Sequence, residues 1–233
     1  MIPIYNFADL SPDQILNRDI QAEADVSAAV DEILSGVREG GDEALRAYTR
    51  RFDGAEIPDL EVSPQEIEAA WSSLDPDFRS TLELAAENIR HFHSQQVHRD
   101  FVVADRPGIV MGQRYTPIQR VGVCVPRSPE AFPSTILMNV IPARIAGVSE
   151  IYVVTPPRPD GSVSAEALAA AHIAGATRVF RVGGAQAVAA LAYGTETIPQ
   201  VDKIVGPGGI FVATAKRKVF GRVAIDMIAG PSE

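Results

Sequence analysis

The amino-acid sequence predicts an α/β protein. Residues 120–233 are expected to form a parallel, doubly wound (Rossmann-like) sheet, and residues 1–119 a helical layer with a β-hairpin. From Val121 onward, short β-branched runs alternate with alanine-rich helical runs, and two of these strand-like runs stop at glycines. Alternation of this kind is typical of a parallel sheet with helices on both faces. Before residue 120 the apolar residues instead recur mainly at helical spacing.

Residues 1–119 carry the start signals of several helices and one hairpin. Ser63-Pro64-Gln65-Glu66 combines a capping box with proline at the first helical position, and Asp75-Pro76 repeats the start signal. Two β-prone runs flank Arg106-Pro107-Gly108, which is typical of a hairpin turn. No sheet within these residues is available to cover the apolar helix faces. We therefore expect this part to belong to an incomplete first domain, with the boundary near Gln119.

Residues 120–233 can be divided into strands and helices by the same patterns. Strands are expected at 121–125, 151–155, 178–182, 203–205 and 223–226. Helices are expected between them at 134–145, 164–174, 185–193 and 210–220.

Two glycine turns, Gly183-Gly184 and Gly206-Pro207-Gly208-Gly209, join a strand to a helix. Glycine permits a sharp turn and a close approach of a ligand, and the helix that follows offers free N–H groups to an anion. In open α/β sheets, ligands bind outside the carboxyl ends of the strands. Neither turn is the G-x-G-x-x-G fingerprint, so these residues alone leave open a nucleotide site or a purely structural turn.

Composition excludes several classes of protein. A net charge of −9 argues against a nucleic-acid surface, which needs a basic patch. No apolar run reaches the length that spans a membrane, so we expect no membrane partner. The single cysteine excludes an internal disulfide framework and suggests a reducing compartment, the cytoplasm.

The amino-acid sequence around the two turns is more specific than the spacing of their glycines. The segment from Val182 reads V-G-G-A-Q-A-V-A-A-L-A-Y-G-T-E-T-I-P-Q-V-D-K-I-V-G-P-G, and A-T-A-K-R-K-V-F and I-D-M-I-A-G-P-S-E follow it. These strings closely resemble the histidinol dehydrogenase family. The match extends upstream through L-M-N-V-I-P-A-R-I-A-G-V and weakly to V-R-E-G-G-D-E-A-L-R-A-Y-T-R-R-F-D.

The resemblance implies an activity and a division of the site. It implies that L-histidinol is oxidised to L-histidine through L-histidinal, with NAD and zinc, in a homodimer. It further implies that this chain is the N-terminal portion of such an enzyme. The catalytic pair and the zinc ligands would then lie downstream, so we assign no catalytic or metal-binding residue here and expect the chain alone to be inactive.

The resemblance also implies four binding positions, two of which depart from the family pattern. Gln186 matches the NAD-contacting glutamine of G-G-A-Q, and Ser232 matches the substrate-contacting serine of G-P-S-E. Cys124 stands where the family has an NAD-contacting tyrosine, and Gly209 where it has an NAD-contacting asparagine. We expect NAD to bind more weakly or in a different pose, with compensation by Arg127 on a phosphate as a further hypothesis.

Other interpretations remain open at this point. The chain could belong to a related NAD-dependent dehydrogenase of another small polar alcohol, or to a non-catalytic nucleotide-binding module. Cys124 could hold a thiohemiacetal, although a lone cysteine at a strand end is usually a small apolar residue. His91, His93 and His98 are expected on one helix without a suitably spaced carboxylate, and His172 is expected to pack within an apolar helix.

Overall fold

A five-stranded parallel sheet forms the centre of the molecule. The computed structural model describes residues 20–126 and 132–228. The strands are β3 (Arg120–Cys124), β4 (Glu150–Val154), β5 (Arg178–Phe180), β6 (Lys203–Val205) and β7 (Ala224–Ile225). Their order is β5-β4-β3-β6-β7, and every neighbouring pair is parallel. The chain moves outward from β3 to β5 and then crosses back to β6, so the order reverses between β3 and β6.

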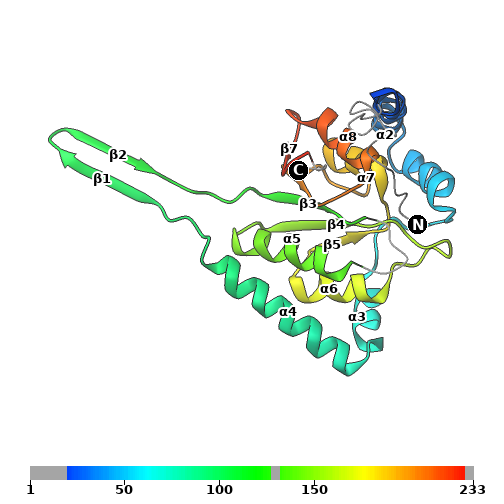
Figure 1. Ribbon diagram of the computed structural model, residues 1–233, viewed down its shortest axis with the longest axis horizontal. Coiled ribbons are helices and arrows are strands. Elements are labelled where there is room, and N and C mark those ends of the chain that lie inside the picture. Colours follow the sequence, from blue (N-terminus) through cyan, green and yellow to red (C-terminus); the bar gives the residue numbers. More distant parts are fainter. Residues whose placement is uncertain (1–19, 127–131, 229–233) are drawn as a thin grey trace, which may run out of the picture.

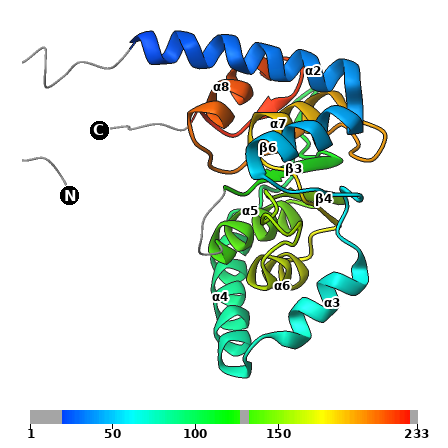
Figure 2. The same ribbon diagram turned by 90° about the vertical axis from the view of Figure 1, so that its right-hand side faces the viewer.

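Helices cover both faces of this sheet, as the sequence predicts. The connecting helices are α5 (Pro133–Ile145), α6 (Ala165–Ala174), α7 (Gly184–Tyr193) and α8 (Ile210–Val219). α5 and α6 lie on one face, and α7 and α8 on the other (Figures 1 and 2). The predicted α/β, doubly wound fold is confirmed, with element bounds close to those expected.

The N-terminal helices form outer layers on the same sheet. α2 (Ile20–Asp53) packs on α7 and α8, α3 (Pro64–Ser73) on α6, and α4 (Pro76–Ser94) on α5 (Figure 2). Val30, Val37 and Leu45 are fully buried in the core that includes α7. The apolar faces of these helices, for which residues 1–119 offer no sheet, pack on the helices of residues 120–233. The division into domains 1–119 and 120–233 stays a prediction.

Local signals set the ends of these helices. The capping box at Ser63 is present: Glu66 N–H donates to Ser63 Oγ at 3.2 Å, and Ser63 N–H donates to Glu66 Oε2 at 2.9 Å. α2 breaks at Gly41, where φ is 51° and ψ −133°. A Cβ there would lie 2.4 Å from Glu196 Oε2, so glycine allows the helix to turn against the loop after α7.

The segment between α2 and α3 attaches this layer to the sheet edge. Val62 N–H donates to Val179 O at 2.9 Å, and Glu61 forms an antiparallel bridge with Phe180. The Arg178 guanidinium pairs with Glu61 through two hydrogen bonds of 2.7 and 2.6 Å. These contacts attach the segment before α3 to β5, although the two are more than 100 residues apart in the sequence.

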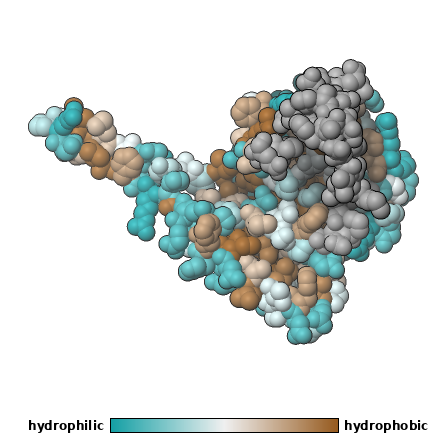
Figure 3. Space-filling model, viewed as in Figure 1, coloured by the Kyte–Doolittle hydropathy of each residue, from teal (hydrophilic) through white to brown (hydrophobic). Residues whose placement is uncertain are grey.

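The predicted hairpin is present and stands away from that body. β1 (Phe101–Arg106) and β2 (Ile109–Gln113) pair antiparallel, with Gly108 at φ 77° in the turn. Every residue of the two strands is exposed, including Val102 at 71% and Val110 at 74% (Figures 1 and 3). Among the described residues, no helix has the length and apolar character needed to cross a membrane.

Candidate functional site

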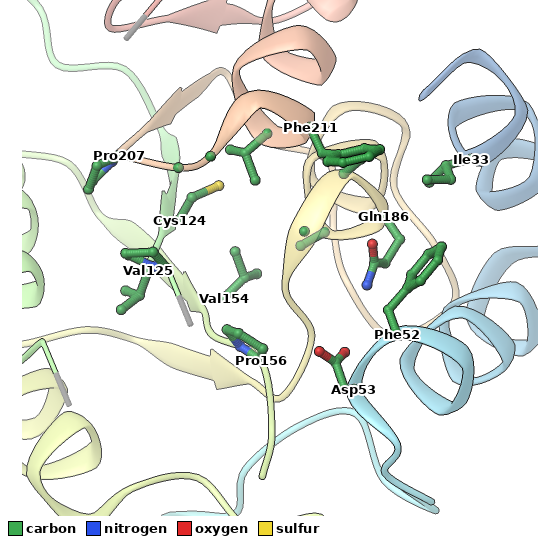
Figure 4. Close-up of a pocket in the computed structure, with 17 residues that line it drawn as sticks. Ile33, Phe52, Asp53, Cys124, Val125, Val154, Pro156, Gln186, Pro207 and Phe211 are labelled. Atoms are coloured by element: carbon green, nitrogen blue, oxygen red, sulfur yellow. The ribbon is translucent and has the colours of Figure 1, made fainter. Parts of the chain in front are cut away.

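A cavity of about 510 Å³ opens at the carboxyl ends of β3 and β4 (Figure 4). Residues 124–126, 184–187 and 207–209 line it, together with side chains of α2, α8 and the segment after β4. It therefore lies over both glycine turns and beside the point where the strand order reverses. Ligands of open parallel sheets bind at this edge.

Cys124 ends β3 and lines the cavity, although its side chain is only 5% exposed. Burial raises the pKa of its thiol to about 12, and the positive charge of Lys216 offsets this only in part. The sulfur therefore stays protonated near neutral pH. Because the thiolate is the nucleophilic form, the geometry does not favour the thiohemiacetal alternative.

Gly206 brings the second turn into contact with β3. Its φ is 104°, and a Cβ built on it would lie 2.3 Å from the carbonyl oxygen of Cys124. A backbone neighbour cannot rotate away as a flexible side chain can. Glycine at this position is therefore a steric requirement of the close approach.

Gln186 lies in the first turn of α7 and is 2% exposed. A Cβ on Gly184, which has φ 67°, would lie 2.6 Å from Gln186 Oε1. The carboxamide therefore folds over the first glycine turn. Figure 4 shows it extending toward Phe52 and Asp53 of α2. An amide there can donate and accept hydrogen bonds at once.

The N-termini of α7 and α8 both adjoin the cavity. Their N-cap residues are Gly183 and Gly209, and neither makes a side-chain capping hydrogen bond. The first N–H groups of a helix have no partner within the helix, and the helix dipole adds partial positive charge. Two such ends beside one cavity suit an anionic group.

Gly209 differs from Gly206 because its backbone does not require glycine. Its φ is −67° and ψ −178°, and an added Cβ would meet nothing within 4 Å. The glycine thus leaves space where the family resemblance places an asparagine amide.

Several side chains of the cavity were missed by sequence reasoning, among them those of Phe52, Asp53 and Phe211. Phe52 and Asp53, at the end of α2, are 43% and 8% exposed, and Phe211 in α8 is 45% exposed. α2 was assigned to a separate domain, so its end was not expected near Gln186. The available signal was the string R-R-F-D, the end of the weak family match in the N-terminal part.

The remaining predicted positions lie elsewhere or outside the described residues. Ser232 and Arg127 fall in the segments that the structure does not describe. α4 ends at Ser94, so the expectation of one helix for three histidines was wrong: His98 lies beyond it and stacks on Tyr115, with ring centroids 4.8 Å apart. His172 is exposed rather than packed inside.

No metal-binding cluster is found in the described part of the chain. Across residues 20–126 and 132–228, no three His, Cys, Asp or Glu side chains gather as a metal site. The cavity is instead a mostly apolar space with the amide of Gln186, the carboxyl group of Asp53, the thiol of Cys124 and two helix N-termini.

Comparison with known proteins gives one consistent result. The family model described as histidinol dehydrogenase matches residues 16–233. The histidinol dehydrogenase of Lactiplantibacillus plantarum is 51% identical over 208 residues, which are 89% of this chain and 48% of that protein. The one of Chlorobaculum tepidum is 47% identical over 235 residues, which are 100% of this chain and 55% of that protein.

Solved structures agree with the sequence comparison. The crystal structure of histidinol dehydrogenase from Elizabethkingia anophelis matches with a TM-score of 0.85 and 32% identity, covering 93% of this chain and 53% of that one. The chain spans about half the length of the relatives it matches. The match of sequence and fold over nearly the whole chain shows that it belongs to the histidinol dehydrogenase family.

Proposed function

We propose that this chain is the dinucleotide-binding portion of an NAD- and zinc-dependent histidinol dehydrogenase. The reaction would oxidise L-histidinol to L-histidine through L-histidinal. One observation supports this most strongly: Cys124, Gln186 and Gly209 line one cavity at the switch point of the sheet, between two uncapped helix N-termini.

The residues present fit NAD. The volume of about 510 Å³ lies within the range of ordinary ligand pockets. Apolar side chains such as Phe52 and Phe211 can hold an aromatic ring, and the N-termini of α7 and α8 can hold the pyrophosphate. When bound, NAD would accept hydride from the alcohol. The role of this chain would be to orient the dinucleotide through Gln186 and to exclude water around it.

The described residues do not fit zinc. Within residues 20–126 and 132–228 no three side chains of ligand type gather. We therefore place the zinc ligands and the proton-transfer groups outside the described residues and derive no step through the metal. On this proposal the chain alone binds NAD but does not turn over histidinol. A single cysteine cannot form an internal disulfide and suits a reducing compartment, and we propose the cytoplasm.

NAD titration of the chain, by calorimetry or fluorescence, tests the proposal. We expect saturable binding, and we expect Gln186→Ala to weaken it about two- to tenfold, since one hydrogen bond is worth about 0.5–1.5 kcal/mol. Gln65→Ala, at an exposed position of α3, is the matched control and should bind as the wild type does. A correctly folded chain that shows no saturable NAD binding would contradict the proposal.

A second candidate is a related dehydrogenase of another small polar alcohol. The small residues Cys124 and Gly209, with free space at the latter, favour it. Steady-state kinetics on the protein as its gene encodes it, with a panel of amino alcohols, distinguishes the two. A kcat/KM higher for another alcohol than for L-histidinol would favour this candidate. A non-catalytic nucleotide-binding module would turn over none of them.

We also propose that the protein works as a homodimer. The hairpin exposes apolar side chains on an arm that stands away from the rest of the described residues, and isolated two-stranded ribbons are marginally stable in water. A second copy would cover it. Sedimentation of Val102→Lys/Val110→Lys should then show a monomer, and an unchanged dimer would contradict a role for the hairpin.

A further inference from the structure

An ion pair with one buried partner, a lysine, lies directly behind the second glycine turn. Lys216 in α8 is only 2% exposed. Its ammonium group donates a hydrogen bond of 3.0 Å to Gly206 O and pairs with the carboxylate of Asp226, just after β7. A lysine is almost never this buried unless it is paired, because a buried charge without a partner is costly. Its two contacts therefore offset the cost of burying the ammonium group.

The same carboxylate completes the contacts of the turn. Asp226 accepts the Gly206 N–H at 2.8 Å and the Met227 N–H at 2.6 Å. Gly206 is thus held at both its N–H and its C=O, while its Cα faces the Cys124 backbone. The pair links three segments: α8, the turn after β6, and the exit of β7.

Burial raises the pKa of Asp226, but the hydrogen bonds from Lys216 and from the backbone N–H groups of Met227 and Gly206 outweigh it and leave the pKa below its usual value. The carboxylate is therefore charged near neutral pH. Only the lysine of this pair is buried, and an ion pair with a desolvated partner often stabilises a fold no more than apolar residues of similar size, so stability alone is a weak reason for it.

Neither side chain of the pair lines the cavity, whereas the turn that they hold does. We propose that Lys216 and Asp226 are positioning residues, which fix the Gly206–Gly209 turn and the N-terminus of α8 in the geometry that binds the dinucleotide. The inference rests on the proposed function, because it assigns these residues a role in that same site. NAD binding would then depend on two residues outside the cavity as well as on the residues that line it.

Measuring both the Tm and the Kd for NAD distinguishes a positioning role of the pair from a purely stabilising one. The variants are made in the protein as its gene encodes it. Lys216→Met removes the contacts of the buried ammonium with Gly206 O and with Asp226, and it should lower the Tm. Lys216→Met/Asp226→Asn removes both charges, keeps an acceptor for the Gly206 and Met227 N–H groups, and should recover part of that loss. The Kd for NAD should rise about tenfold or more in both variants, because both remove the charge-assisted hydrogen bond that holds Gly206 O and with it the turn.

Lys218→Met is the matched control on the same helix. Lys218 also pairs with an aspartate, Asp31, at 2.8 Å, but it ties α8 to α2 rather than to the turn. The same substitution there should leave the Kd for NAD unchanged. In steady-state kinetics the two Lys216 variants should raise the KM for NAD with little effect on kcat at saturating NAD.

The outcomes distinguish this inference from the proposed function. If Lys216→Met binds NAD as the wild type does, or if the Kd of the double variant returns to the wild-type value together with the Tm, the pair is only structural. In either case the proposed function still stands. If the wild type itself binds no NAD, the proposed function fails, and the positioning role fails with it.

Discussion

Replacing Gly206 with alanine should lower both the stability of the fold and the affinity for NAD. Gly206 has a φ of 104°, and its Cβ would lie 2.3 Å from the backbone oxygen of Cys124. The substitution therefore combines a conformation that alanine rarely adopts with a steric clash against a strand of the central sheet.

The expected magnitude follows from these two effects. A non-glycine residue at strongly positive φ costs about 1–3 kcal/mol, and relieving an overpacked contact costs about 1–3 kcal/mol more. We expect a loss of about 3 kcal/mol in the free energy of unfolding. For a chain of this size that corresponds to a fall in Tm of about 6–12 °C.

Gly209→Ala is the matched control, because it makes the same chemical change in the same turn. Gly209 has a φ of −67° and open space around its Cβ position, so alanine should change stability by less than about 1 kcal/mol. Differential scanning fluorimetry with and without NAD measures both effects. Equal Tm values for the two variants would refute the steric account of the turn.

Four further predictions follow from single contacts. Gly209→Asn should tighten NAD binding about two- to tenfold by supplying the amide that the family resemblance places there, and titration measures it. Arg178→Met should cost about 1 kcal/mol in urea unfolding by removing the partly exposed pair at the sheet edge, whereas Arg50→Met, in a pair 60% and 72% exposed, should cause no measurable change. Because the folded-state pKa of Asp226 lies below its usual value, its contribution to stability is fully present above that usual value and is lost as pH falls through the folded-state pKa. Urea midpoints should therefore stay level down to about pH 5 and fall below about pH 4, and Asp226→Asn should reduce the fall. Cys124, with its pKa raised to about 12, should resist alkylation until the chain unfolds, as mass spectrometry would show.

Local patterns in the sequence were sufficient for most of the secondary structure. The parallel strands are buried β-branched runs, and glycines such as Gly183 and Gly206 mark the turns that follow them. The capping box at Ser63 and the proline after Asp75 gave two helix starts directly. These signals act over a few residues, so they can be read without the tertiary structure.

Long-range packing could not be predicted in the same way. No local pattern shows that α2 lies on α7 and α8, so Phe52 and Asp53 were missed as cavity residues. The pair of Lys216 and Asp226 joins an otherwise ordinary helix lysine to a residue after β7, and neither stands out in the sequence. Gln186, Cys124 and Gly209 were found through the family resemblance, and the structure adds that they share one cavity.

The central claim is that the two glycine turns hold a dinucleotide. A crystal structure of the protein as its gene encodes it, in complex with NAD, tests this claim most directly. We expect the pyrophosphate at the N-termini of α7 and α8, with the carboxamide of Gln186 in contact with the dinucleotide. A dinucleotide bound away from residues 183–187 and 206–209 would contradict the account.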